Sequence, residues 1–151
     1  MERSEDEILA EGLAALGGGG GGGGLVRMVA RVMGKNVHEI DLLAPLSFDD
    51  AVRRVSGVLA RTGRAVGPPR VHPGEAATLR IVTGGGAGGL NPVVVTVRVR
   101  RAGAGGSEVL LRAAAKEGLI RQRAGEKTAV RLAVELSRAT GADTAGGSSP
   151  A

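Results

Sequence analysis

The residues best suited to chemistry in this chain are arginines at alternate positions of three predicted strands. Arg outnumbers Lys 17 to 3. A planar guanidinium can donate two hydrogen bonds at once to a phosphate or a carboxylate. Because side chains alternate between the two sides of a strand, the strand arginines share one sheet face, opposite an aliphatic one. This predicted arginine face consists of Arg80, Arg98, Arg100 and Arg112.

A second basic group lies at the start of the last predicted helix. It consists of Lys116, Arg121 and Arg123. Positive charge at a helix N-terminus opposes the helix dipole, so these side chains are candidates for binding a partner or an anion. The alternative for both groups is that these side chains are ordinary surface charges that face solvent and bind no partner.

Composition limits the kind of anionic partner. Phe48 is the one aromatic residue, so the base stacking that sequence-specific single-strand binders use is not available. We therefore expect an anionic macromolecule to be bound through its charge, either nucleic acid non-specifically or an acidic protein, with strong salt dependence.

Enzymatic chemistry is poorly supported. The chain has no Cys, and its two histidines lie apart, with His38 facing opposite to Glu39 and Asp41 in an extended segment. Gly84–Gly89 fits G-x-G-x-x-G, but a strand pattern follows it where a dinucleotide site needs a helix N-terminus. We expect no enzyme, no metal site and no cofactor.

Charge and composition divide the chain into four parts. Residues 1–16 are acidic and predict a short amphipathic helix, which starts with a capping box at Ser4 and Glu7. Residues 17–24 are eight glycines and predict a flexible tether, and 141–151 predict a disordered tail. Residues 25–140 form a single domain with a net charge of +10. The acidic helix could fold back on this basic domain as a mobile cover.

Periodicity places the elements of that domain. Helical patterns cover 25–33, the stretch from the Ser47 N-cap to Gly63, and 119–139, with an extended segment over 37–44. Strand alternation covers 77–82, 93–100 and 108–113, and glycine-rich loops separate these strands as in a meander.

Strand register can be predicted from the aliphatic side chains. Opposing Val99 with Val109 places Arg100 across from Glu108, a favourable cross-strand pair. For the other pair of strands, the predicted register opposes Ile81 with Val93. Together, the two predicted registers make one face of the three-stranded sheet almost wholly aliphatic.

The predicted fold is an α+β domain. A three- to five-stranded antiparallel sheet is packed on one face by helices, including a long C-terminal helix. The order is also compatible with a helix-grip arrangement, in which the sheet wraps around that helix.

The main functional expectation is a non-enzymatic interaction module for an anionic partner. The alternative is a carrier for a small apolar ligand, held in a cavity between the sheet and the C-terminal helix. Four small residues could leave space for that cavity or equally permit tight closure: Ala113, Ala115, Gly125 and Ala129. Assembly through the 77–82 edge strand is a third reading. No targeting or membrane-spanning pattern is present, so the expected location is cytoplasmic.

Overall fold

The computed structural model describes residues 4–16, 34–72, 75–85, 90–117 and 123–144. The predicted helix over 25–33 and the glycine tether lie outside these residues. The described helices are α1 (Glu5–Leu16), α3 (Phe48–Thr62), the short 3-10 helix η2 (Gly103–Gly105) and α4 (Ala124–Thr140). The long strands are β1 (Gly34–Ala44), β4 (Ala76–Gly85), β5 (Asn91–Arg101) and β6 (Ser107–Glu117). The short strands are β2 (Arg64–Ala65), β3 (Arg70–His72) and β7 (Asp143–Thr144).

The strands form one antiparallel sheet in the order β2-β4-β5-β6-β1-β7, and β3 pairs with β4 beside β2. The predicted meander is confirmed as β4-β5-β6. The described sheet has seven strands, more than the three to five predicted, because the extended segment pairs along β6 and three short strands add to the edges.

One of the two predicted registers is confirmed and the other is wrong. Val99 opposes Val109 as predicted. Ile81 opposes Val95, whereas Val93 was predicted, so this register differs by two residues. A shift of two leaves every side chain on its predicted face, because the side-chain period of a strand is also two.

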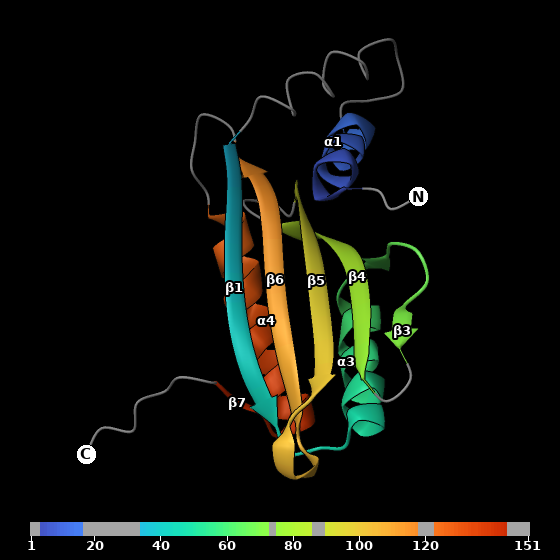
Figure 1. The fold of residues 1–151 in the computed structure, drawn as a ribbon. Helices are drawn as coiled ribbons and strands as arrows, with labels where there is room; N and C mark the ends of the chain where they lie inside the picture. The colour runs from blue at the N-terminus through green and yellow to red at the C-terminus, as the bar shows by residue number, and fades with distance from the viewer. Residues whose placement is uncertain (1–3, 17–33, 73–74, 86–89, 118–122, 145–151) are drawn as a thin grey trace, which may run out of the picture.

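The two longer helices of the domain cover the aliphatic face of the sheet. Figure 1 shows α3 and α4 behind the four long strands, with α4 along β1 and β6 and α3 toward β4. The main core lies between these layers, and its sheet side includes Val95, Val97 and Leu111, all nearly inaccessible to solvent. The predicted packing of helices on one sheet face is thus confirmed.

Local sequence signals determine where the two helices begin and end. Ser47 caps α3 by accepting a hydrogen bond from the Asp50 amide, and the Gly63 amide donates to the Leu59 carbonyl at its end. Helix α4 is described from Ala124, and Gly141 ends it in the left-handed conformation that favours glycine. Residues 118–122, where the prediction began that helix, lie outside the described residues.

The two outermost long strands, β4 and β1, differ in how much of their outer edge is paired. Arg64–Ala65 and Arg70–His72 pair with β4, so the 77–82 segment that was read as a free edge is largely covered. On the other side, β7 pairs with β1 only at Leu42 and Leu43. Residues 141–144 were placed in the predicted tail, but Ala142 is buried and Asp143–Thr144 joins the sheet, because Gly141 turns the chain toward β1. Residues 145–151 lie outside the described residues.

Candidate functional site

The arginine face is the side of the sheet opposite α3 and α4. Its side chains form rows that run across the four long strands, from β1 through β6 and β5 to β4. The row nearest to α1 is apolar and consists of Val37, Ala114, Val94 and Val82. The next row consists of Glu39, Arg112, Thr96 and Arg80. The two further rows bring in Arg98 and Arg100.

Helix α1 lies against the upper part of this face, near the top of the molecule in Figure 1. Its first turn holds the capping box that the sequence predicts: the Ser4 amide donates to Glu7 Oε2 at 2.9 Å, and the Glu7 amide donates to Ser4 Oγ at 3.2 Å. The structure therefore places the acidic helix on the basic domain, as the cover hypothesis anticipated.

Acidic side chains of α1 pair with cations of the sheet. Arg112 donates from Nε to Glu5 Oε1 at 3.0 Å and from Nη2 to Glu5 Oε2 at 3.3 Å. Lys116 Nζ lies 3.0 Å from Asp6 Oδ1, and this lysine is only 5% exposed. A lysine that is so buried requires a carboxylate beside it, and α1 supplies that carboxylate.

Apolar contact follows one turn later along α1. Ile8 and Leu9 form a small buried cluster with Val94, against which Val66 and Val82 also pack. Burying one such side chain contributes about 1.5–3 kcal/mol, whereas an ion pair near the surface contributes about 0.2–1 kcal/mol. The aliphatic pair is therefore the larger source of docking energy, and the ion pairs set the orientation of the helix.

A second carboxylate holds Arg112 from the neighbouring strand. Arg112 Nη1 donates to Glu39 Oε1 at 2.5 Å, across the β1–β6 pair. Hydrogen bonds to Glu5 and then to Glu39 raise the pKa of Arg112 above its already high usual value. This guanidinium therefore keeps its charge throughout the ordinary pH range.

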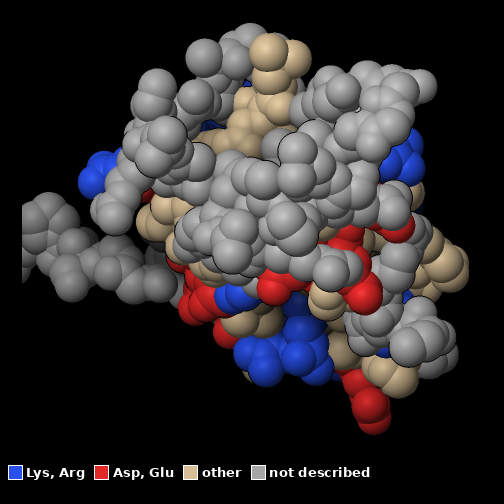
Figure 2. Space-filling model, turned by 90° about the horizontal axis from the view of Figure 1, so that it is seen from above, with Lys and Arg blue, Asp and Glu red and all other residues tan. Residues whose placement is uncertain are grey.

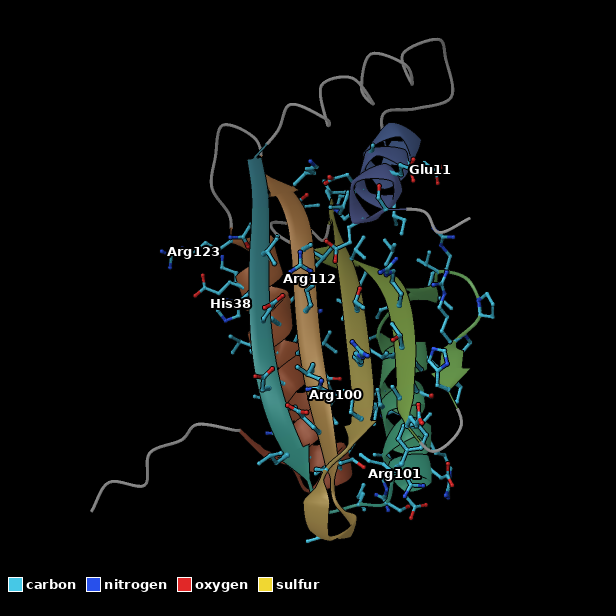
Figure 3. The ribbon with its side chains drawn as sticks, in the orientation of Figure 1. Glu11, His38, Arg100, Arg101, Arg112 and Arg123 are labelled. Atoms are coloured by element: carbon cyan, nitrogen blue, oxygen red, sulfur yellow. The ribbon has the colours of Figure 1, made fainter. Side chains whose placement is uncertain are left out.

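The lower part of the arginine face differs from the part beneath α1. Arg100 makes the predicted cross-strand ion pair, with Nη2 2.6 Å from Glu108 Oε2, and Arg80 Nε donates to Thr96 Oγ1 at 3.0 Å. Arg98 is exposed. Figure 3 shows Arg112 close to α1 and Arg100 farther down the sheet. Figure 2 shows the molecule from above, and acidic (red) and basic (blue) side chains adjoin in the lower part of that view.

The structure brings together five of the seven candidate residues. They are Arg80, Arg98, Arg100, Arg112 and Lys116, which project from the same side of β4, β5 and β6. Arg123 is separate from these five residues, because it precedes α4 in the other layer. Its Nε lies 3.6 Å from Glu126 Oε2, and Figure 3 shows it beside β1, on the side of the sheet away from β4. Its backbone is left-handed, so Arg123 itself precedes α4 and is not part of the helix that was predicted to include it. Arg121 lies outside the described residues.

Other candidate chemistry does not assemble. His38 alternates with the exposed Glu39 and Asp41 and lies on the α4 side of β1, as the strand pattern predicts. Within the described ranges, no three His, Asp or Glu side chains come together as a group that could hold a metal ion. After Gly85 the next described element is strand β5, so the glycine-rich segment joins two paired strands.

The sheet and α4 make close contact at the position where an apolar cavity was expected. A Cβ atom on Gly125 would lie 2.7 Å from the Asn36 carbonyl oxygen and 3.1 Å from that of Ala113. Ala113, Ala115 and Ala129 are fully buried. Small residues therefore serve close helix–sheet packing at this point, which is one of the two outcomes that the sequence allows.

An apolar hollow is present elsewhere, between α3 and strand β4. Its volume is about 150 Å³, and apolar atoms supply most of its lining. The floor includes Leu59, Leu79 and Ile81, and the Gly67–Pro69 segment borders it. It lies where the chain between β2 and β3 bulges away from β4. No periodic pattern in the sequence predicts this hollow.

Comparisons with known proteins assign this chain to no family. No protein-family model and no curated protein matches the chain. Among solved structures, the crystal structure of Ara h 8.0201 is similar at a TM-score of 0.42 and 12% sequence identity, covering 72% of this chain and 97% of that chain. None of the helices in the described ranges is both long and apolar enough to cross a bilayer.

Proposed function

We propose that this chain is a non-enzymatic binding module whose arginine face engages an anionic macromolecule, with α1 as the segment that a partner displaces. The observation that carries the proposal is the pairing of Glu5 with Arg112 and of Asp6 with Lys116. An acidic segment of the chain itself occupies the basic surface. Arg98 and Arg100, which the contacts of α1 described above do not reach, extend this surface farther down the sheet.

The test is to weaken the cover without changing the face. In the full chain, Glu5→Gln with Asp6→Asn removes both ion pairs and keeps the shape of each side chain. An exposed ion pair contributes about 0.2–1 kcal/mol, and the pair with the nearly buried Lys116 contributes more, because its loss leaves a buried cation without a carboxylate. Affinity for a polyanion should therefore rise at least about twofold. The measurement is fluorescence anisotropy of labelled duplex DNA and of labelled polyglutamate, each at low and at physiological salt.

A matched control is Glu135→Gln with Asp49→Asn. Both residues are exposed and lie on α4 and α3, in the other layer, so they change the net charge equally without touching α1. If the control strengthens binding as much as the test variant, the effect is one of net charge alone. If neither probe binds any variant at low salt, the proposed function is wrong.

A second candidate is a helix-grip-type carrier of a small apolar ligand, and the hollow between α3 and β4 favours it. Apolar atoms supply most of its lining, although Ser56 and Arg80 also border it, and its volume of about 150 Å³ suits a single ring or a short hydrocarbon chain. Toluene titrated into the protein should shift the methyl NMR signals of Leu59, Leu79 and Ile81. Ala60→Leu, at the hollow, should abolish the shifts, whereas Val130→Leu on the exposed side of α4 should not.

A further inference from the structure

The part of the arginine face beneath α1 has two chemically different halves. Along β6, Arg112 and Lys116 present positive charge on either side of Ala114. On the neighbouring strands β5 and β4, Val94 and Val82 present an aliphatic surface. A polyanion such as a nucleic-acid backbone satisfies the first half and leaves the second in contact with water. A ligand that matches both halves must carry carboxylates and aliphatic groups in a fixed spatial order.

An α-helix provides that order, since residues three and four apart lie on the same face. In α1, Glu5 and Leu9 are four residues apart, and both point at the sheet. Lys116 is almost fully buried, so a ligand must pack closely on the sheet to bring a carboxylate within reach of its ammonium group. This requirement restricts the shape of the ligand as well as its charge. Flexible acidic chains do not hold their carboxylates in this relation to an apolar pair.

We propose that the partner of the arginine face is an acidic amphipathic helix of another polypeptide, one that carries adjacent carboxylates a single turn ahead of a pair of aliphatic side chains. The inference rests on the proposed function and narrows it to one class of partner. The α1 segment occupies the site in the absence of the partner. A tether that includes eight glycines keeps it nearby in either state.

The experiment uses the full chain with its own helix disabled. Ile8→Asp with Leu9→Asp removes the aliphatic pair and leaves the sheet unaltered. A labelled peptide of residues 1–16 is then titrated in trans and followed by anisotropy. We expect it to bind this variant at least about tenfold more tightly than it binds the unmodified chain, whose α1 competes for the site.

Two comparisons separate this inference from simple charge attraction. A scrambled peptide of the same composition should bind at least about tenfold more weakly than the α1 peptide. Raising the salt concentration should weaken duplex binding far more than peptide binding, because the peptide is also held by apolar contacts. Circular dichroism checks that the variant is folded. Glu5→Lys with Asp6→Lys provides a second way to release the helix, because it replaces the two ion pairs with repulsion from Arg112 and Lys116.

The outcomes are distinct. Equal binding of native and scrambled peptides would overturn the helix inference and leave a general polyanion site. Binding of duplex but of neither peptide would also overturn it, in favour of nucleic acid. Failure of every anionic probe at low salt would remove the proposed function together with the inference.

Discussion

Individual side chains determine how closely the layers of this protein approach. Gly125 is the clearest case, because backbone oxygens of β1 and β6 lie where its Cβ would be. Backbone atoms in a paired sheet cannot move aside as a flexible side chain can. Gly57, in the middle of α3, has no such neighbour; the nearest atom to an added Cβ is Arg61 Nη1 at 3.6 Å.

The same substitution should therefore have opposite effects at these two glycines. Gly125→Ala should lower the free energy of unfolding by about 1–3 kcal/mol through overpacking. Gly57→Ala should raise it by up to about 1 kcal/mol, because Ala costs less conformational entropy within a helix. Urea unfolding followed by circular dichroism measures both. A stabilised Gly125→Ala protein would show that α4 can move away from the sheet without cost.

The helices owe their ends to short-range signals, and α3 shows this most clearly. Ser47 Oγ accepts from the Asp50 amide at 3.3 Å and donates to Asp50 Oδ2 at 3.0 Å. At its other end, the Thr62 hydroxyl donates to the Val58 carbonyl. Arg54 Nη1 donates to the Ala139 carbonyl at 3.0 Å, which links α3 to the last turn of α4.

Removing the cap of α3 should destabilise the whole domain, because the helix forms part of the main core. Ser47→Ala should cost about 0.5–2 kcal/mol. Ser56→Ala makes the same chemical change inside α3 and should be close to neutral, since alanine is favoured there. Thermal unfolding of the two variants beside the unmodified chain gives the comparison. Equal losses would mean that the Ser47 contacts do not cap the helix.

Sequence reasoning succeeded for the elements whose signals are local. The N-cap at Ser47, the end of α4 at Gly141 and the capping box at Ser4 each depend on a few neighbouring residues. The β5–β6 register was also predictable, because Arg100 and Glu108 fix it by charge. The β4–β5 register was not, since valine occupies so much of β5 that a shift of two residues preserves the aliphatic face.

Long-range pairings of the candidate site could be predicted only in part. Alternation placed Arg112 on the correct face, but its pair with Glu39 spans 73 residues and required knowing that β1 adds beside β6. The fold-back of the acidic helix was one possibility among several. Its contacts depend on how the 17 residues from 17 to 33 connect α1 to β1, and composition does not specify this.

At the scale of the whole molecule, the chain consists of a two-layer domain and a helix attached to the open side of its sheet. Aliphatic contacts of Ile8 and Leu9 supply most of the attachment, and the ion pairs of Glu5 and Asp6 orient it. High salt screens the second kind of contact and spares the first. The attachment should therefore survive salt but not the loss of its apolar pair.

This difference is measurable because the natural chain has no cysteine. Spin labels on Glu11→Cys and Gly103→Cys would report the distance from α1 to the β5–β6 connection. We expect a narrow distance distribution that 1 M salt leaves largely intact, and a broad one once Leu9→Asp is added. A distribution that broadens with salt alone would mean that charge dominates the attachment.

The unequal edges of the sheet affect how the protein behaves at high concentration. Among the described residues, only β7 pairs with the outer edge of β1, at Leu42 and Leu43, and this leaves backbone groups along the edge for a neighbouring molecule. Glu39 and Asp41 are exposed along this strand, and like charges on two approaching copies repel. Glu39→Gln with Asp41→Asn should therefore speed the growth of light-scattering aggregates in concentrated solution, whereas Glu135→Gln should not. These two carboxylates would then contribute to shelf life as well as to the fold.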